Sequence, residues 1–418
     1  IYRKTKLFIM AKTIQPKKTD SNEARRILEQ LAKSLPIQEK KVDDPIEYIS
    51  TGVYILNAAL SGTIYGGVRC GKVTVFAGEE STGKTFLALN VCREAQKMYN
   101  KQIIYIDTES NISLDDLHKY GIDRENFTLY PINKVEDLTI QLNMLIEGFK
   151  ASNSKNLYMI VIDSVGQMAS KKEKDDLTDG NLKTDMTKSK ALSTLFRTVT
   201  ADLGALNIPL ICCNQTYQTL DMFPKTIMKG GNQLYYSASV ITFLTKAKLK
   251  EDVDNIISEE LSIGQTGIIV SAKCVKNRNV QPRKVKFELS HNKGANPYMG
   301  LDIFCVPELF HKIGIAKGKM EVDKSTGEMK FIAGGNRWYV NHLNTHIAYK
   351  DLFNSLIFTK EVLDAIDLIV QKNFKYKTQE EVNDEWTKIA TELKAKKGGV
   401  IDNLDLDSDD ISSLFDEE

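Results

Sequence analysis

The chain has 418 residues, of which 42% are hydrophobic and 27% are charged, and its formal net charge is +1. This length and composition allow a large buried core and two or three domains. No apolar run reaches the ~18 to 20 residues that cross a bilayer, and no signal peptide with a cleavage site is visible, so we expect neither a membrane-spanning nor a secreted protein. We therefore expect a soluble cytoplasmic protein without a membrane partner.

The near-neutral charge hides an asymmetry between the last residues and the rest of the chain. Residues 398–418 form an acidic tail without Lys or Arg, whose carboxylates are Asp402, Asp405, Asp407, Asp409, Asp410, Asp416, Glu417 and Glu418. Without these charges the rest of the chain carries about +9. A basic body with an acidic tail favours a protein that binds a polyanion, with the tail competing with that polyanion for the basic surface. Such a tail can also serve solubility alone.

The cysteines form no CxxC pair and lie mostly inside apolar runs. They are Cys70, Cys92, Cys212, Cys213, Cys274 and Cys305. This pattern predicts buried free thiols in a reducing compartment rather than disulfides or a zinc site.

A glycine-bounded loop near residue 80 lies between a strand pattern, Val73–Ala77, and a helix pattern, Phe86–Val91. It matches the phosphate-binding pattern, in which glycines let backbone N–H groups point inward and the helix N-terminus favours anions. The predicted nucleotide-binding residues are Gly78, Glu79, Glu80, Ser81, Thr82, Gly83, Lys84 and Thr85. We expect Lys84 to reach the β- and γ-phosphates of ATP and the Thr85 hydroxyl to hold Mg²⁺.

Strand and helix patterns alternate after this loop, which predicts an α/β core with a mostly parallel sheet covered by helices. The predicted strands are Gln102–Asp107, Phe127–Ile132, Tyr158–Asp163 and Leu210–Asn214, and the predicted helices are Leu87–Tyr99, Val135–Lys150 and Ser189–Leu206. Three strand patterns without helices between them are expected as antiparallel additions to the sheet edge: Val240–Thr245, Thr266–Val275 and Lys284–Leu289. A helix over Leu301–Ile313 is expected to close this core.

We divide the chain into an N-terminal helix and linker (1–44), the core (45–314), a small C-terminal helical region (315–397) and the acidic tail (398–418). The N-terminal helix, over Asp20–Leu35, is amphipathic, and it packs either on its own core or on a neighbouring subunit. The C-terminal region has helical patterns at Glu361–Gln371 and Gln379–Leu393. The nine residues before Met10, a candidate start site, are left out of this prediction.

Three polar side chains end predicted strands at the edge where the phosphate loop lies. Asp163 follows an apolar run and is expected to hold a water on Mg²⁺. Glu109 lies just past the Gln102–Asp107 strand and is placed to orient the attacking water. Gln215 ends a third strand with an amide, which can hydrogen-bond a γ-phosphate. Because a diphosphate lacks that phosphate, this contact could link the state of the nucleotide to the loop that follows.

Two segments at this edge, 166–188 and 216–234, are longer than simple connections. They combine lysines with aromatic residues and glycines, a composition that fits a single strand of nucleic acid, while a solvated loop face is the alternative. The predicted DNA-contacting residues are Lys171, Lys172, Lys174, Tyr217, Phe223, Lys225, Lys229, Gly230 and Gly231, and Lys183 and Lys188 add to the charge of the first segment.

The order of these motifs resembles the core of the RecA-type recombinases over roughly residues 46–313. The matching strings are Ile49-Ser50-Thr51-Gly52, GEESTGKT, IDTES, VIDSVGQMAS, CCNQ, Gly230-Gly231 and Val275-Lys276-Asn277-Arg278. Within the family, the stretch from Ser164 to Ala238 is most similar to the recombinases of T-even-type bacteriophages. The resemblance implies a RecA-like ATPase fold and a helical filament on single-stranded DNA, with ATP between neighbouring subunits.

The resemblance also implies residue roles. Glu109 matches the residue that activates water, Gln215 the γ-phosphate sensor, and the two long segments the DNA-contacting loops. Lys276 and Arg278 match a basic pair that reaches the phosphates of a neighbouring subunit, where cations compensate the charge of the transition state. Without the resemblance, such a pair on a strand would be interpreted as surface charge. Asp116 stands where the family has an adenine-stacking Tyr, and Tyr120 is the nearest aromatic substitute.

These features predict an ATP- and Mg²⁺-dependent protein that forms filaments on single-stranded DNA, pairs it with homologous double-stranded DNA and exchanges strands. Single-strand-binding and loader proteins are expected partners, and the host bacterial cytoplasm is the expected location for a phage-encoded protein. One alternative is a hexameric DNA helicase or packaging motor on the same core. Another is a recombination mediator that does not hydrolyse ATP, although a purely structural chain has no need for Lys84, Thr85, Glu109, Asp163 and Gln215 together.

Overall fold

The computed structural model describes residues 46–152, 156–178, 187–220, 222–230, 232–250, 265–290, 294–384 and 387–388. The chain divides into two units, Ile1–Ile46 and Glu47–Glu418, and the description below concerns the second. The expected helix over Asp20–Leu35 and the acidic tail lie outside the described residues.

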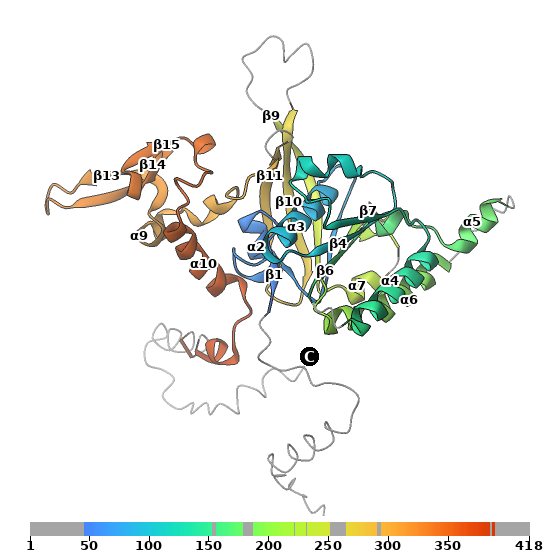
Figure 1. Ribbon diagram of the computed structural model, residues 1–418. Coiled ribbons are helices and arrows are strands. Elements are labelled where there is room, and N and C mark those ends of the chain that lie inside the picture. Colours follow the sequence, from blue (N-terminus) through green and yellow to red (C-terminus); the bar gives the residue numbers. More distant parts are fainter. Residues whose placement is uncertain are drawn as a thin grey trace, which may run out of the picture. The chain divides into compact units, whose positions relative to one another are not determined.

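A large mixed sheet forms the centre of this unit, as expected (Figure 1). Its parallel strands lie in the order β3, β7, β6, β4 and β5, with β5 at the edge. Their bounds are β3 Val73–Gly78, β4 Gln102–Asp107, β5 Phe127–Tyr130, β6 Tyr158–Asp163 and β7 Leu210–Gln218. Because parallel strands all end at one edge, their last residues and the segments that follow them gather there.

The sheet continues on the other side of β3 through β9, β10, β11 and β12. These strands span Val240–Lys250, Gln265–Asn277, Lys284–Ser290 and Gly294–Ala295. The prediction of antiparallel additions is confirmed for β10 and β11, whereas β9 runs parallel to β3 and is the strand on which the antiparallel part begins. The short helix before β9, α7 (Gln233–Ser237), returns the chain to the start of β3, so β9 can run in the same direction.

Helices cover both faces of the sheet (Figure 1). The helices α2 (Tyr54–Ser61) and α3 (Lys84–Tyr99) pack on one face, and α4 (Val135–Ala151) and α6 (Thr187–Ala205) pack on the other. The strands are buried on both faces, because alternate residues enter the two apolar clusters: Phe76 packs towards α3, whereas Val75 and Ala77 pack towards the opposite face. All six cysteines are buried and free, as predicted.

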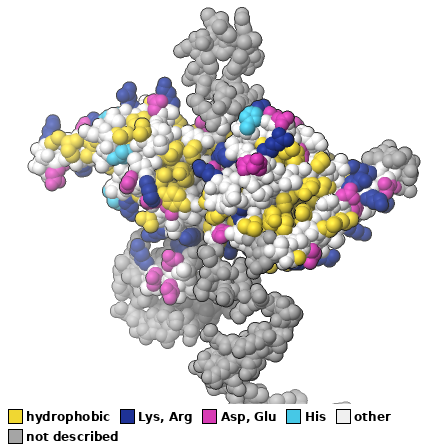
Figure 2. All heavy atoms as spheres, in the orientation of Figure 1, with side chains coloured by type: hydrophobic (Ala, Val, Ile, Leu, Met, Phe, Trp, Pro, Cys, Tyr) yellow, Lys and Arg dark blue, Asp and Glu magenta, His cyan; other side chains and the backbone are white. Residues whose placement is uncertain are grey.

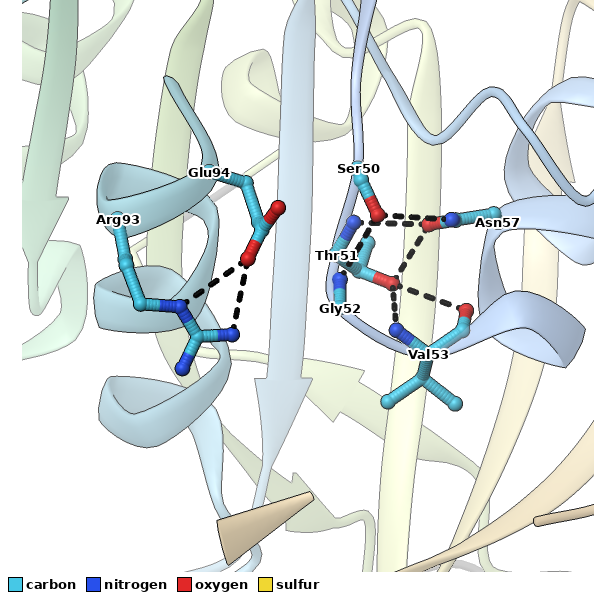
Figure 3. A network of polar contacts seen from close by, with 7 residues as sticks. All are labelled: Ser50, Thr51, Gly52, Val53, Asn57, Arg93 and Glu94. Atoms are coloured by element: carbon cyan, nitrogen blue, oxygen red, sulfur yellow. Dashed lines mark hydrogen bonds and ion pairs between the residues drawn. The ribbon is translucent and has the colours of Figure 1, made fainter. Parts of the chain in front are cut away.

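The Ile49-Ser50-Thr51-Gly52 string forms the turn that leads from β1 (Tyr48–Ile49), paired with β2 (Val68–Arg69), into α2. Asn57 Oδ1 accepts hydrogen bonds from the Thr51 N–H at 2.8 Å and the Thr51 hydroxyl at 2.7 Å (Figure 3). Gly52 has a φ of +80°, and a Cβ there would lie 3.2 Å from a guanidinium nitrogen of Arg93 on α3, which is drawn beside the turn. This string therefore fixes the start of the fold beside α3.

The predicted helix over Leu301–Ile313 is wrong. The structure has three short pieces instead, η3 (Leu301–Phe304), η4 (Pro307–Leu309) and α9 (Phe310–Ile313). Proline lacks the N–H that would bond one turn back and disfavours helical conformation in the residue before it, so Pro307 breaks the helix there.

The segment after Gly314 contains a three-stranded antiparallel sheet that the prediction of a helical region did not include. Its strands are β13 (Ile315–Val322), β14 (Met329–Val340) and β15 (Thr345–Ile347). Much of β14 is exposed on both faces, so its sequence lacks the apolar alternation that indicates a strand. The predicted helix at Glu361–Gln371 is present as α10 (Lys360–Phe374), preceded by the short turns η5 (Asn341–Leu343) and η6 (Tyr349–Asp351).

The helix α10 is joined to the core by a buried carboxylate. Asp367 Oδ1 accepts hydrogen bonds from the Thr63 hydroxyl at 2.7 Å and the Ile64 N–H at 2.8 Å. Residues 379–384 and 387–388 are helical, and the rest of the helix predicted over Gln379–Leu393 lies outside the described residues. Among the helices described, none is both long and apolar enough to cross a bilayer.

Candidate nucleotide and nucleic-acid site

The phosphate loop joins the end of β3 to the start of α3, as its sequence predicts. A Cβ at Gly78 would lie 2.5 Å from the Leu244 carbonyl oxygen, and Gly83, which precedes α3, has a φ of +87°. Both positions therefore need glycine for the backbone to curl. Lys84 Nζ folds over the loop and donates to the carbonyls of Gly78 at 3.1 Å and Glu79 at 2.6 Å.

Burial lowers the pKa of Lys84, and the nearby charges of Asp163, Glu109 and Glu80 oppose that change. A half-buried ammonium is incompletely hydrated, so it gains more from an anionic partner than an exposed one does. This side chain is therefore suited to a phosphate held in the loop.

Thr85 and Asp163, the two residues predicted to hold Mg²⁺, are in contact. The Thr85 hydroxyl donates to Asp163 Oδ2 at 2.6 Å, and the Tyr105 hydroxyl donates to the same oxygen at 2.9 Å. Burial raises the pKa of the Asp163 carboxyl, whereas these two hydrogen bonds lower it. A buried carboxylate beside a hydroxyl and a phosphate loop fits Mg²⁺, which prefers oxygen ligands and takes several of them from water and substrate phosphates.

The described residues contain no group of three or more His, Cys, Asp or Glu side chains that could hold a metal ion by themselves.

Glu109 lies at the same edge on a turn fixed by its neighbours. The Asp107 carboxylate accepts the N–H groups of Glu109 at 3.0 Å and Ile112 at 2.9 Å, and the Ser164 hydroxyl donates to Glu109 Oε1 at 2.7 Å. The Thr108 hydroxyl accepts from the Ser164 N–H at 2.8 Å and donates to the Ser164 carbonyl at 2.9 Å. The ends of β4 and β6 are thus tied together, which holds an exposed carboxylate beside the phosphate loop.

Tyr105, Thr108 and Ser164 were missed by sequence reasoning, although they fix Asp163 and Glu109. Tyr105 lies in an apolar run, which gives no signal of a role at the site. The hydroxyls of Thr108 and Ser164 are adjacent to the predicted site residues, and that adjacency was the available signal.

Gln215 lies beside the phosphate loop, because β7 pairs with β3 so that Gln215 is the partner of Gly78. Its Oε1 accepts a hydrogen bond from Lys229 Nζ at 2.7 Å. The amide predicted to contact a γ-phosphate is therefore also in contact with the second predicted DNA segment.

In its described residues, 166–178 and 187–188, the first predicted DNA segment is mostly helical. The turn η2 (Val165–Gln167) leads to α5 (Lys171–Thr178), which begins with a reciprocal cap in which Ser170 Oγ accepts the Glu173 N–H at 3.0 Å. Three lysines of α5, Lys171, Lys172 and Lys174, are offset by Glu173, Asp175 and Asp176. Figure 2 shows basic and acidic side chains mixed around this helix.

Lysines of the first segment, Lys174 and Lys188 among them, have partners within the chain. Lys174 Nζ donates to Asn133 Oδ1 at 2.6 Å. Lys188 lies on α6, where its Nζ donates to the Gly166 carbonyl at 2.8 Å and burial lowers its pKa. Lys183 lies outside the described residues. The charge available to DNA on this segment is therefore smaller than the count of lysines suggests.

The second segment begins as a hairpin, because β7 continues to Gln218 and pairs with β8 (Thr226–Met228). Large apolar side chains at and near its tip are exposed: Met222 is 90% exposed, Phe223 78% and Tyr217 47%. Lys225 is exposed beside them, and Gly230 has a φ of +90°, while Gly231 lies outside the described residues. Exposed rings beside a lysine at the phosphate edge suit stacking on unpaired bases.

Lys276 and Arg278 do not lie level with the phosphate loop of their own chain along the strands. Lys276 pairs with Ile241 of β9, whereas Gly78 at the end of β3 pairs with Leu244 of the same strand. Along the strand direction, Lys276 and the phosphate loop are therefore about 10 Å apart. Lys276 Nζ donates to the Tyr235 carbonyl at 2.5 Å and lies 5.1 Å from the Tyr235 ring centroid. Arg278 donates to the Tyr236 carbonyl at 3.0 Å.

Asp116 belongs to η1 (Leu114–Tyr120) and pairs with Lys119 at 2.5 Å, which lowers the Asp116 pKa. The Tyr120 ring lies edge-on to Phe86, 6.2 Å between centroids. Since Phe86 follows Thr85, an aromatic pair lies near the start of α3.

The comparisons with known proteins agree with this geometry. Residues 27–296 match the family model of the RecA N-terminal domain, which covers more than half of the chain. The chain belongs to the RecA family. It is 28% identical to the "Recombination and repair protein" of Enterobacteria phage T4 over 77% of this chain and 79% of that protein.

Bacterial members of the family are similar over a shorter range. The chain is 31% identical to "Protein RecA" of Sulfurimonas denitrificans over 60% of this chain and 68% of that protein. It is 32% identical to "Protein RecA" of Wolinella succinogenes over 62% of this chain and 69% of that protein. The chain is thus a RecA-family recombination protein, and the predicted resemblance is confirmed.

Proposed function

We propose that this protein is a single-stranded-DNA-dependent ATPase that forms helical filaments on single-stranded DNA and catalyses homologous pairing and strand exchange. The observation that carries the proposal is that the ends of β3, β4, β6 and β7 gather a phosphate loop, Asp163, Glu109 and Gln215 at one edge. The hairpin with exposed rings begins at that same edge. Nucleotide chemistry and DNA contact would therefore share one side of the sheet.

Each of the gathered side chains would have a separate role in phosphoryl transfer. The Lys84 ammonium leaves the loop carbonyls and compensates charge on the β- and γ-phosphates of bound ATP. Thr85 and Asp163 would hold Mg²⁺, which when bound neutralises charge on the phosphate oxygens. Glu109, held by Ser164, accepts a hydrogen bond from the attacking water and orients it.

Lys276 and Arg278 would complete the site of a neighbouring copy. Their distance from the phosphate loop of their own chain supports a role in another chain. Head-to-tail contact between identical chains produces a filament when the rotation does not close. ATP bound between copies would then link nucleotide state to filament formation.

DNA contact would come chiefly from the hairpin after Gln215. Phe223 and Tyr217 supply rings for stacking, and Lys225 supplies charge for the phosphates. The mixed charge of α5 supports a smaller contribution from Lys171 and Lys172. Double-stranded DNA, single-strand-binding proteins and loader proteins are further proposed partners, and the host cytoplasm is the proposed location.

The test combines ATP hydrolysis with electron microscopy, with and without single-stranded DNA. We expect DNA-stimulated phosphate release and helical filaments with ATP, and loss of hydrolysis in K84A and E109Q. Closed rings would favour a helicase or motor instead. DNA binding without hydrolysis in the wild-type protein would favour a mediator.

A further inference from the structure

The Lys229 ammonium contacts the predicted γ-phosphate sensor, although the sequence places this lysine among the DNA contacts. Its Nζ lies 2.7 Å from Gln215 Oε1. The β7–β8 ladder pairs Thr216 with Met228, and one step further the Lys229 N–H donates to the Gln215 carbonyl at 2.9 Å. Residues directly opposite in an antiparallel pair project to the same face. The contact is therefore set by the register of the hairpin.

The backbone of Lys229 is held from the other side by a buried amide. Asn214 Nδ2 donates to the Lys229 carbonyl at 2.8 Å, and Asn214 Oδ1 accepts the Gln215 N–H at 2.9 Å. A Cβ at Gly166 would lie 2.8 Å from Asn214 Oδ1 and 3.3 Å from Lys229 Cβ, so the first segment packs closely here. The backbone of Lys229, and so the Cβ from which its side chain extends, is therefore held in place beside Gln215.

The chemistry of the pair decides which end of the Gln215 amide faces Lys229. An ammonium only donates hydrogen bonds, whereas an amide has an accepting oxygen and a donating nitrogen. Lys229 therefore holds the Oε1 end and leaves the Nε2 end, with its two N–H groups, for another partner. Gln215 lies next to Gly78, where a nucleotide's phosphates would be anionic acceptors.

We propose that Lys229 is a positioning residue that orients the Gln215 amide with its N–H groups towards the γ-phosphate. The inference rests on the proposed function, because it presumes a nucleoside triphosphate in the phosphate loop. Without Lys229 the amide is free to turn its oxygen towards the phosphate, where two acceptors repel. A diphosphate has no γ-phosphate, so its binding does not depend on this orientation.

The experiment measures the affinity of the full chain for a non-hydrolysable ATP analogue and for ADP, each with Mg²⁺ and without DNA. Lys229→Met removes the donor and keeps the length of the side chain. Lys229→Arg keeps a donor-only group. Lys190→Met is the matched control, since Lys190 is an exposed lysine on α6 and undergoes the same chemical change.

We expect K229M to reduce the preference for triphosphate over diphosphate by roughly 3- to 10-fold, about the worth of one hydrogen bond. K229R should restore most of the preference, K190M should leave it unchanged, and K229M combined with Q215A should be no worse than Q215A alone. Equal preferences in wild type and K229M, or a fall in ADP affinity as large as that for the triphosphate, would overturn the inference.

The two proposals fail in different ways. A wild-type protein that binds triphosphate but shows no DNA-stimulated hydrolysis and no filaments would overturn the proposed function, while a changed preference in K229M would still support the role of Lys229. If the wild-type protein hydrolyses ATP on DNA but K229M keeps the wild-type preference for triphosphate, the proposed function stands and the role of Lys229 is overturned.

Discussion

Replacing Tyr105 by Phe would remove one hydroxyl from the proposed Mg²⁺ carboxylate and keep the packing around it. Tyr105 is fully buried, and its ring stacks on Phe127 with 5.5 Å between centroids. Its hydroxyl donates to Asp163 Oδ2 at 2.9 Å. A hydrogen bond to a charged group contributes about 1.5–3 kcal/mol, so we expect Y105F to lower the free energy of unfolding by about that amount at pH 8.

The loss should depend on pH in a defined direction. Burial raises the pKa of Asp163, and the Tyr105 hydrogen bond opposes this, so Y105F should raise the pKa further. The destabilisation is complete where the carboxyl is ionised and shrinks as pH falls through the raised pKa, because the protonated carboxyl depends less on the donor. Y105F should therefore lie closer to wild type at pH 5 than at pH 8.

Thermal unfolding without nucleotide or DNA provides the assay. For a chain of this size we extrapolate roughly 1–2 °C per kcal/mol, so Y105F should unfold about 2–6 °C below wild type at pH 8. Tyr99→Phe is the matched control, since the Tyr99 hydroxyl donates to the uncharged Tyr48 carbonyl at 3.0 Å. Y99F should show a small loss that is the same at both pH values. An equal Y105F loss at pH 5 and pH 8 would refute this reasoning.

Two further changes test the proposed DNA contacts. Phe223→Ala should weaken single-stranded DNA binding, measured by fluorescence anisotropy, by about 1–3 kcal/mol per stacked base, without lowering the unfolding temperature. Leu356→Ala removes another exposed apolar side chain and should not change DNA binding. Unchanged DNA binding in F223A would exclude stacking on Phe223. Truncation after Gly399 should strengthen DNA binding, most at low salt, because eight carboxylates no longer compete with the phosphates. Equal or weaker binding of the truncated chain at matched salt would contradict that.

Much of the core was predictable because its signals are local. The β3 run and the glycines of the phosphate loop follow a fixed pattern of residue types, and the apolar runs of β4, β6 and β7 are typical of strands buried on both faces. The placement of Asp163, Glu109 and Gln215 at one edge follows from the shared direction of parallel strands. Their chemical roles stay predictions.

The parts that escaped prediction depend on partners distant in the sequence or on exposed strands. The direction of β9 is set by its pairing with β3, more than 160 residues earlier, and periodicity carries no information on pairing. Much of β14 is exposed on both faces, so its sequence shows no apolar alternation. The partners of Lys188 and Lys229 follow from packing rather than from composition. Charge counts therefore overestimated the basic surface of the first segment.

The most direct test of the account mixes two inactive variants. K84A lacks the phosphate-loop ammonium, and K276A/R278A lacks the cations proposed to reach a neighbour. If each site joins the loop of one copy to the cations of the next, random mixing restores about a quarter of the sites, so DNA-stimulated phosphate release should reappear. Mixtures as inactive as either variant alone, or full activity of K276A/R278A by itself, would contradict the shared site.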